Sequence, residues 1–161
     1  MAAVDYFLKI DGIPGESQDD KHMDEIDLES WSWDEKNAGS HAAGGGGGAG
    51  KVEMHDFSFA MQANKASPKL FLACATGQHI ASALLTCRKA GKEGQEYLKY
   101  KFNDLLISNF QTGGSAGEVV PVDKISFNFS KIEFSYAPQK ADGSLDSPVV
   151  HNYDLKKNKG G

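Results

Sequence analysis

Positive charge is what this chain most clearly lacks. Its 17 lysine and arginine residues are outnumbered by 22 aspartate and glutamate residues, and the formal net charge is −5. A nucleic-acid-binding surface needs concentrated basic side chains to neutralise phosphates, and the basic residues here are scattered. The small run at Lys156, Lys157 and Lys159 is expected to be part of a flexible, solvated tail over residues 156–161. The composition therefore argues against a nucleic-acid partner.

Neither a secretion signal nor a membrane-spanning segment is expected from the sequence. The first ten residues carry Asp5 and no basic segment ahead of an apolar run, which is not the pattern of a cleavable signal peptide. Residues 70–87 have no formal charge, but the polar stretch 76–79 divides them, so we expect two separate elements and no membrane insertion. The chain is expected to fold in the cytoplasm, with Cys74 and Cys87 as buried, reduced thiols.

Motifs for catalysis, metal binding and phosphate binding are absent as well. The glycine-rich run 44–50 with Lys51 imitates a P-loop, but Val52 stands where a serine or threonine is needed for magnesium. The five histidines have no zinc-type spacing, and the sequence contains neither a C-x-x-C pair nor a G-x-S-x-G elbow. We therefore predict that the protein is not an enzyme and binds no cofactor or metal.

What the chain does contain is the alternation of apolar and polar positions that is typical of β-strands. In three long segments the alternation changes phase once, near Ser30, His55 and Ser130. A bulge at each point would bend the strand and raise its twist, which predicts a strongly curled sheet or a closed barrel. Alternatively, both faces of these segments are buried, one against the core and one against another subunit. The two interpretations are compatible.

One helix is expected between residues 64 and 77. Ser67 is the predicted N-cap, Pro68 the first helical residue and Gly77 the residue that ends the helix. A later segment, residues 96–111, is expected to form one long strand, or two strands broken near Asp104.

The predicted fold is mainly β, a small antiparallel β-barrel with one short α-helix and long inter-strand loops. We expect a single domain over residues 1–161, with an extended glycine-rich loop over residues 34–50. A loop of that length exceeds what a compact domain needs, which is typical of a functional or a disordered segment.

Several short motifs follow one another in a fixed order along nearly the whole chain. They are Glu25-Ile26-Asp27, Ser30-Trp31-Ser32-Trp33, GGGGGAGKV at residues 44–52, Leu72-Ala73-Cys74, Arg88-Lys89-Ala90-Gly91, Glu96-Tyr97-Leu98, Thr112-Gly113-Gly114-Ser115, Asn128-Phe129 and Pro138-Gln139-Lys140-Ala141-Asp142-Gly143. Each motif is weak alone, but their order and spacing together resemble the Hcp family, the tube-forming proteins of bacterial type VI secretion. Two positions depart from the family pattern: Asp34 stands where glycine usually follows the tryptophan motif, and Asn152-Tyr153 stands where Gly-Trp is common.

The resemblance implies a barrel that forms a homohexameric ring. Rings would stack into a tube inside a contractile sheath, with a spike protein at the tip. The lumen of the rings would carry small effector proteins. The protein would assemble in the cytoplasm and then be secreted without a signal peptide. By the same resemblance, Ser32 would face the lumen and contact effectors, and the loop glycines would contact a neighbouring ring or subunit: Gly44, Gly45, Gly46, Gly47, Gly48 and Gly50.

Two related functions remain open at this point. A soluble ring that acts mainly as an effector carrier or chaperone would use the same barrel without obligatory stacking. A phage tail tube protein is a close variant of the secretion tube.

Overall fold

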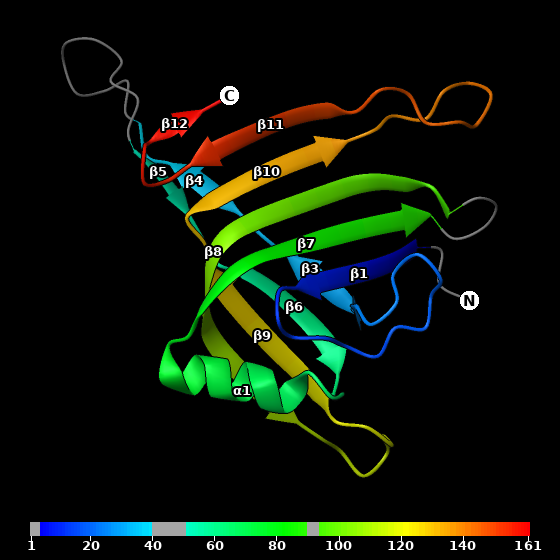
Figure 1. The fold of residues 1–161 in the computed structure, drawn as a ribbon, viewed down its shortest axis with the longest axis vertical. Helices are drawn as coiled ribbons and strands as arrows, with labels where there is room; N and C mark the ends of the chain where they lie inside the picture. Colours follow the sequence, from blue (N-terminus) through cyan, green and yellow to red (C-terminus); the bar gives the residue numbers. More distant parts are fainter. Residues whose placement is uncertain (1–3, 40–50, 90–93) are drawn as a thin grey trace.

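The computed structural model describes residues 4–39, 51–89 and 94–161, and most of these residues lie in strands (Figure 1). The strands are β1 Val4–Ile10, β2 Ile26–Asp27, β3 Ser30–Ser32, β4 Glu35–Asn37, β5 Val52–Met54, β6 Phe57–Gln62, β7 His79–Lys89, β8 Glu96–Gly113, β9 Val122–Asn128, β10 Lys131–Tyr136, β11 Val149–Asp154 and β12 Lys159–Gly160; the helix is α1, Ser67–Thr76. The described residues contain no helix that is both long and apolar enough to cross a membrane.

The strands form one strongly bent antiparallel sheet that branches at β8. One branch follows the order β12-β11-β10-β8-β7-β1-β2, and the other continues from β8 through β9 and β6 to β3. The predicted mainly β, antiparallel class is confirmed. Among the described residues the sheet does not close into the predicted barrel, since β2 pairs with β1 whereas β3 pairs with β6. Strands β4 and β5 form a separate two-stranded sheet.

The 18-residue strand β8 carries the bend of the sheet. Its first half pairs with β7 and β10, and its second half pairs with β9. Between the halves Asp104 has a φ of 57°, a left-handed conformation that a residue other than glycine rarely adopts. The strand is therefore continuous but sharply turned at the position where the sequence suggested a break (Figure 1).

The three phase changes in the sequence are corners where the chain changes its pairing partner. The first separates β2, which pairs with β1, from β3, which pairs with β6. The second separates β5, which pairs with β4, from β6, which pairs with β3 and β9. The third separates β9 from β10; both pair with β8, but with different halves of it, and the second partner changes from β6 to β11. The predicted bulges at these points are wrong, because the strands end and begin again. The expected consequence, a strongly curled sheet, is confirmed.

Helix α1 lies against β8 and begins differently from the prediction. Ala66 occupies the N-cap position, and Ser67 is already helical. The Ser67 hydroxyl donates instead to the buried carboxylate of Asp123, at 2.6 Å, and Thr112 Oγ1 donates to the same carboxylate at 2.7 Å. Gly77 ends the helix in the left-handed conformation, as predicted, with a φ of 68°.

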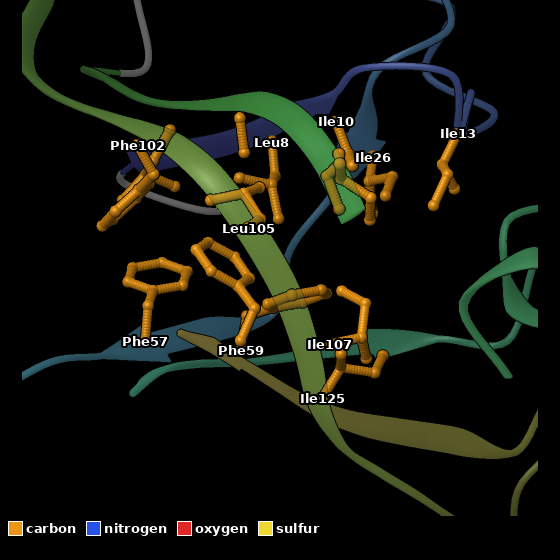
Figure 2. Packing of buried hydrophobic residues seen from close by; sticks show 14 of the residues in the cluster. Leu8, Ile10, Ile13, Ile26, Phe57, Phe59, Phe102, Leu105, Ile107 and Ile125 are labelled. Carbon is orange, nitrogen blue, oxygen red and sulfur yellow. The ribbon is translucent and has the colours of Figure 1, made fainter. Parts of the chain in front are cut away.

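Aromatic side chains from β6, β8 and β9 form the centre of the core. The rings of Phe57, Phe102 and Phe127 lie 4.9–5.1 Å apart from centroid to centroid, and all three side chains are fully buried. Figure 2 shows Leu8 of β1 and Ile125 of β9 pointing toward the same interior. Burying each aromatic side chain contributes about 2–3 kcal/mol, so this cluster holds the two halves of the bent sheet together.

Both cysteines are free thiols, as expected, but only Cys87 is fully buried; Cys74 is half-buried. Burial raises the pKa of the Cys87 thiol to about 12. That side chain is consequently a neutral, inert part of the core.

The end of the chain is a strand and not the flexible tail that was predicted for residues 156–161. Strand β12 pairs with β11 through Lys159 and Gly160, and Gly161 exchanges two backbone hydrogen bonds with Asn152, at 2.9 and 3.0 Å. Backbone hydrogen bonds of this kind form whatever the polarity of the side chains. The lysine-rich composition, from which the flexible tail was predicted, was therefore misleading.

Candidate functional surfaces

One face of the branch β3-β6-β9-β8 is polar and faces away from the core. Along β6 and β9 buried residues alternate with partly exposed ones, so Ser58 and Ser126 lie on the outward side. Their hydroxyl groups hydrogen-bond to each other at 2.8 Å. Ser32, the predicted lumen residue, is exposed at the edge of this face and pairs with Ser58. We call this surface the polar sheet face.

The polar sheet face contains an open hollow of about 330 Å³. Its outward-pointing side chains are small or uncharged with one exception, the ammonium group of Lys124. The hollow is lined by Ser30, Trp31, Ser32, Ser58, Phe59, Ala60, Asn109, Gln111, Lys124, Ile125 and Ser126. No carboxylate or imidazole in this lining could activate a serine hydroxyl, so the hollow is suited to binding rather than to nucleophilic catalysis.

A second surface is apolar and extends from the core onto the edge of the sheet. We call it the apolar wing, made of Phe134 and Tyr136 of β10 and Val149 of β11. These side chains are 40%, 45% and 59% exposed. The wing is continuous with the core, because the rings of Phe134 and the buried Tyr100 lie 4.4 Å apart. Exposed apolar side chains grouped in this way mark an interaction surface.

The glycines predicted to contact a neighbouring ring lie outside the described residues, but the base of their loop is described. Trp33 Nε1 donates to the carbonyl oxygen of His55 at 2.9 Å, and the His55 amide donates to the carbonyl of Asp34 at 3.1 Å. His55 Nδ1 also lies 2.7 Å from Asp34 Oδ2. The aspartate that departs from the family pattern thus adds a side-chain hydrogen-bond contact that a glycine could not make. The β4–β5 hairpin begins directly after this contact.

Charged residues fix the loop between β1 and β2 onto the sheet. Arg88 donates two hydrogen bonds to Asp19, at 3.0 and 2.7 Å, and one to Asp5, at 2.9 Å. Its hydrogen bonds lower the pKa of Asp19 to about 2. The guanidinium group also lies 4.8 Å from the centre of the Phe7 ring. This network is structural in character, because every group in it is engaged by another.

His22 lies beside the Arg88 network and joins the same loop to β8. Its ring stacks on Phe7 at 4.3 Å, with Nδ1 2.9 Å from Glu25 Oε2 and Nε2 2.6 Å from Glu96 Oε1. Burial raises the pKa of Glu96, but hydrogen bonds from His22 and Lys99 outweigh burial, and the pKa is lowered overall. Within the described ranges no three histidine, cysteine or acidic side chains are placed to hold a metal ion.

The fold and its exposed surfaces together define a mainly β subunit suited to contacts with other proteins. The family profile described as "Type VI secretion system effector, Hcp" matches residues 7–136. The chain is 45% identical over 158 residues to protein hcp1 of Pseudomonas aeruginosa, covering 97% of this chain and 98% of that one. The chain therefore belongs to the Hcp family, whose members are tube proteins of type VI secretion; its role is that of a structural tube subunit and not of an enzyme.

Solved structures agree with this assignment. The crystal structure of Hcp1 from Salmonella typhimurium has a TM-score of 0.80 and 37% sequence identity, over 99% of this chain and 100% of that one. A structure described as a type six secretion system protein has a TM-score of 0.93 and 27% identity, over 99% and 100% of the two chains.

The sequence pointed to the polar sheet face through one residue, gave a partial signal for the apolar wing and missed the Arg88 network. Ser32 was placed by resemblance, and the structure adds Ser58, Asn109, Lys124 and Ser126, which come from three further strands. The signal for the apolar wing is the alternation of Ile132, Phe134 and Tyr136, in one of the three segments for which we predicted either a bulge or a second face buried against another subunit. The Arg88 network had no sequence signal, because its members are separated by up to 83 positions.

Proposed function

We propose that this protein assembles into homohexameric rings that stack into the type VI secretion tube. In this proposal a contractile sheath expels the tube behind a spike protein, and effector proteins occupy the lumen. Assembly takes place in the cytoplasm, and the protein leaves the cell with the tube. Membership of the Hcp family supports the proposal, since tube proteins of this family form ring and tube assemblies.

The observation that carries the self-association step is the apolar wing. Phe134, Tyr136 and Val149 are at least 40% exposed although they continue the core. A single subunit leaves this apolar area in water, and packing it against a neighbour removes it from water. In this proposal the wing packs against a different surface of the neighbouring subunit, so the contact is heterologous, and heterologous contacts whose rotation closes form a ring.

The polar sheet face is proposed to line the lumen, with Ser32 among the side chains that contact effectors. Its hydroxyl and amide groups suit a surface that must stay hydrated between cargoes. The loop of residues 34–50, including Gly44–Gly48 and Gly50, is proposed to contact a neighbouring ring or subunit. The described base of this loop, held by Trp33, Asp34 and His55, would set its direction.

Size-exclusion chromatography with light scattering tests ring formation, and negative-stain electron microscopy reads symmetry and stacking. We expect a closed ring with six subunits and, at high concentration, stacked rings. A strict monomer at high concentration would overturn the proposal. Rings that never stack, from a chain that is dispensable for secretion, would instead favour a soluble effector carrier.

A further inference from the structure

The hollow in the polar sheet face carries a positive charge, whereas the whole chain has a net negative charge. The protein has five more acidic than basic residues by formal charge, yet no carboxylate lines this hollow. Its one charged side chain is Lys124, which is exposed in β9 and pairs with Gln111 of β8. A local field of one sign on an otherwise acidic surface favours ligands of the opposite charge.

The uncharged groups around Lys124 are able to donate hydrogen bonds. Asn109 and Gln111 carry amide groups that each have two N–H donors. In the Ser58–Ser126 pair one hydroxyl donates to the other, and the accepting hydroxyl keeps its own hydrogen for a ligand. Ligand carboxylates only accept hydrogen bonds, so they would meet an ammonium group, amides and hydroxyls, and no acidic side chain belongs to the lining of the hollow.

We propose that this hollow is a docking site for acidic segments of a partner protein, with Lys124 as the residue that selects them. The inference rests on the proposed function in that the partner would be the cargo of the tube. A basic segment would place its lysines near Lys124 and find no carboxylate in the hollow. Nucleic acid is a poorer fit, because one ammonium group per subunit neutralises few phosphates.

Ring assembly would strengthen such a weak site. Each subunit would present one copy of Lys124 to the same lumen, and a flexible acidic segment could engage several copies at once. Linking weak contacts in this way raises the overall affinity well above that of one contact. The selectivity would then depend on salt, since exposed charges are screened at physiological ionic strength.

Fluorescence anisotropy with two labelled peptides tests the inference. Both peptides are built from glycine and serine, one with glutamate at every third position and the other with lysine there. The full-length protein in its ring state should bind the acidic peptide and not the basic one. We expect Lys124→Gln to weaken acidic-peptide binding by about tenfold and Lys124→Glu to abolish it. Lys9→Gln, which removes an exposed ammonium group from β1, should change nothing.

Four results would overturn the inference. The first is equal binding of the two peptides, and the second is unchanged acidic-peptide binding by the Lys124→Glu variant. The third is a single-stranded oligonucleotide that binds as tightly as the acidic peptide. The fourth is failure of Lys124→Glu to form rings, which would show that this face is a contact between subunits. Failure of the proposed function is separate, because it would appear as a monomeric or non-stacking wild-type protein.

Discussion

Arg88 shows how one side chain ties together segments that are far apart in the sequence. Its guanidinium group contacts Asp5 of β1 and Asp19 of the following loop, and it lies over the ring of Phe7. The hydrogen bonds to Arg88 lower the pKa of Asp19 from 3.8 to about 2. Because the folded-state pKa is the lower one, the stability that Asp19 contributes is present above about pH 4 and is lost as the pH falls toward 2.

Replacing Arg88 with alanine should therefore remove stability in a pH-dependent way. We expect a loss of about 2 kcal/mol in the free energy of unfolding at pH 7, after allowing for solvent screening of the pair with Asp19. The difference from wild type should shrink as the pH falls from 4 to 2. Urea unfolding at several pH values, at one protein concentration, measures it. Lys9→Ala serves as the control, and a pH-independent loss would contradict the role given to Asp19.

Asp104 combines an unusual backbone conformation with two ion-pair contacts. Hydrogen bonds from Lys156 and His79 lower the pKa of its carboxyl group. Its φ of 57° is accessible to glycine and asparagine but strained for alanine. The bend of β8 depends on this conformation, while the ion pairs are exposed to solvent.

Asp104 variants should separate these two contributions. We expect the Asp104→Ala variant to unfold at a temperature about 3 °C below that of Asp104→Gly, because only glycine adopts the left-handed conformation without strain. Asp104→Asn should lie close to the glycine variant. Differential scanning calorimetry measures all three, and equal midpoints for alanine and glycine would show that the bend does not store strain here.

Helix α1 is held by its packing and not by its own propensity. It has ten residues, too few for a stable isolated helix, and its buried residues are Leu70 and Ala73. Phe71 and Leu72 are 58% and 54% exposed, but the Phe71 ring packs edge-on against Phe110 of β8, with the ring centroids 6.3 Å apart. The helix therefore contacts β8 through a partly exposed aromatic side chain as well as through its buried residues.

Leu70 and Leu72 form a matched pair for testing this packing. Leu70→Ala should cost about 2–4 kcal/mol in the free energy of unfolding, since it leaves a cavity in the core. Leu72→Ala makes the same chemical change at an exposed site and should cost less than about 0.5 kcal/mol. Chemical denaturation of both variants gives the comparison. Similar losses in the two would mean that Leu72 is covered, for example in the assembled ring.

The whole subunit has two faces of different chemistry, the polar sheet face and the apolar wing. They lie on different branches of the sheet, which the bend in β8 separates. This separation would let a subunit contact its neighbour with one branch while presenting hydroxyl and amide groups with the other. An assembly subunit needs both surfaces at once.

A charge placed in the apolar wing should prevent assembly without unfolding the subunit. We expect Phe134→Lys to shift the molar mass measured by light scattering toward that of a monomer. Ser135→Lys adds the same charge to the adjacent residue on the opposite face of β10 and should leave the ring intact. Circular dichroism checks that both variants fold. An intact ring of the Phe134→Lys variant would exclude the wing as the subunit contact.

Local patterns in the sequence were sufficient for the strand-rich class, the helix near residues 67–76 and the turn at Gly77. These features depend on the alternation of apolar and polar residues and on the backbone preferences of single residues. Both can be recognised in the sequence without knowing which distant residues are in contact. Ser67 was misplaced as a cap because its hydroxyl bonds to Asp123, a residue 56 positions away. The terminal strand β12 was missed for a different reason: it pairs with the neighbouring strand β11 across a short turn, and its lysine-rich composition carries no strand signal.

By itself, the sequence determined the antiparallel strand class, the curled sheet and, through an ordered set of motifs, the Hcp family. Only the tertiary structure decided that the phase changes at Ser30, His55 and Ser130 are corners where the chain changes partners. It also decided which side chains form the polar sheet face, the apolar wing and the Arg88 network. Periodicity shows that a strand has two faces, but which face meets the core depends on pairing between residues distant in sequence.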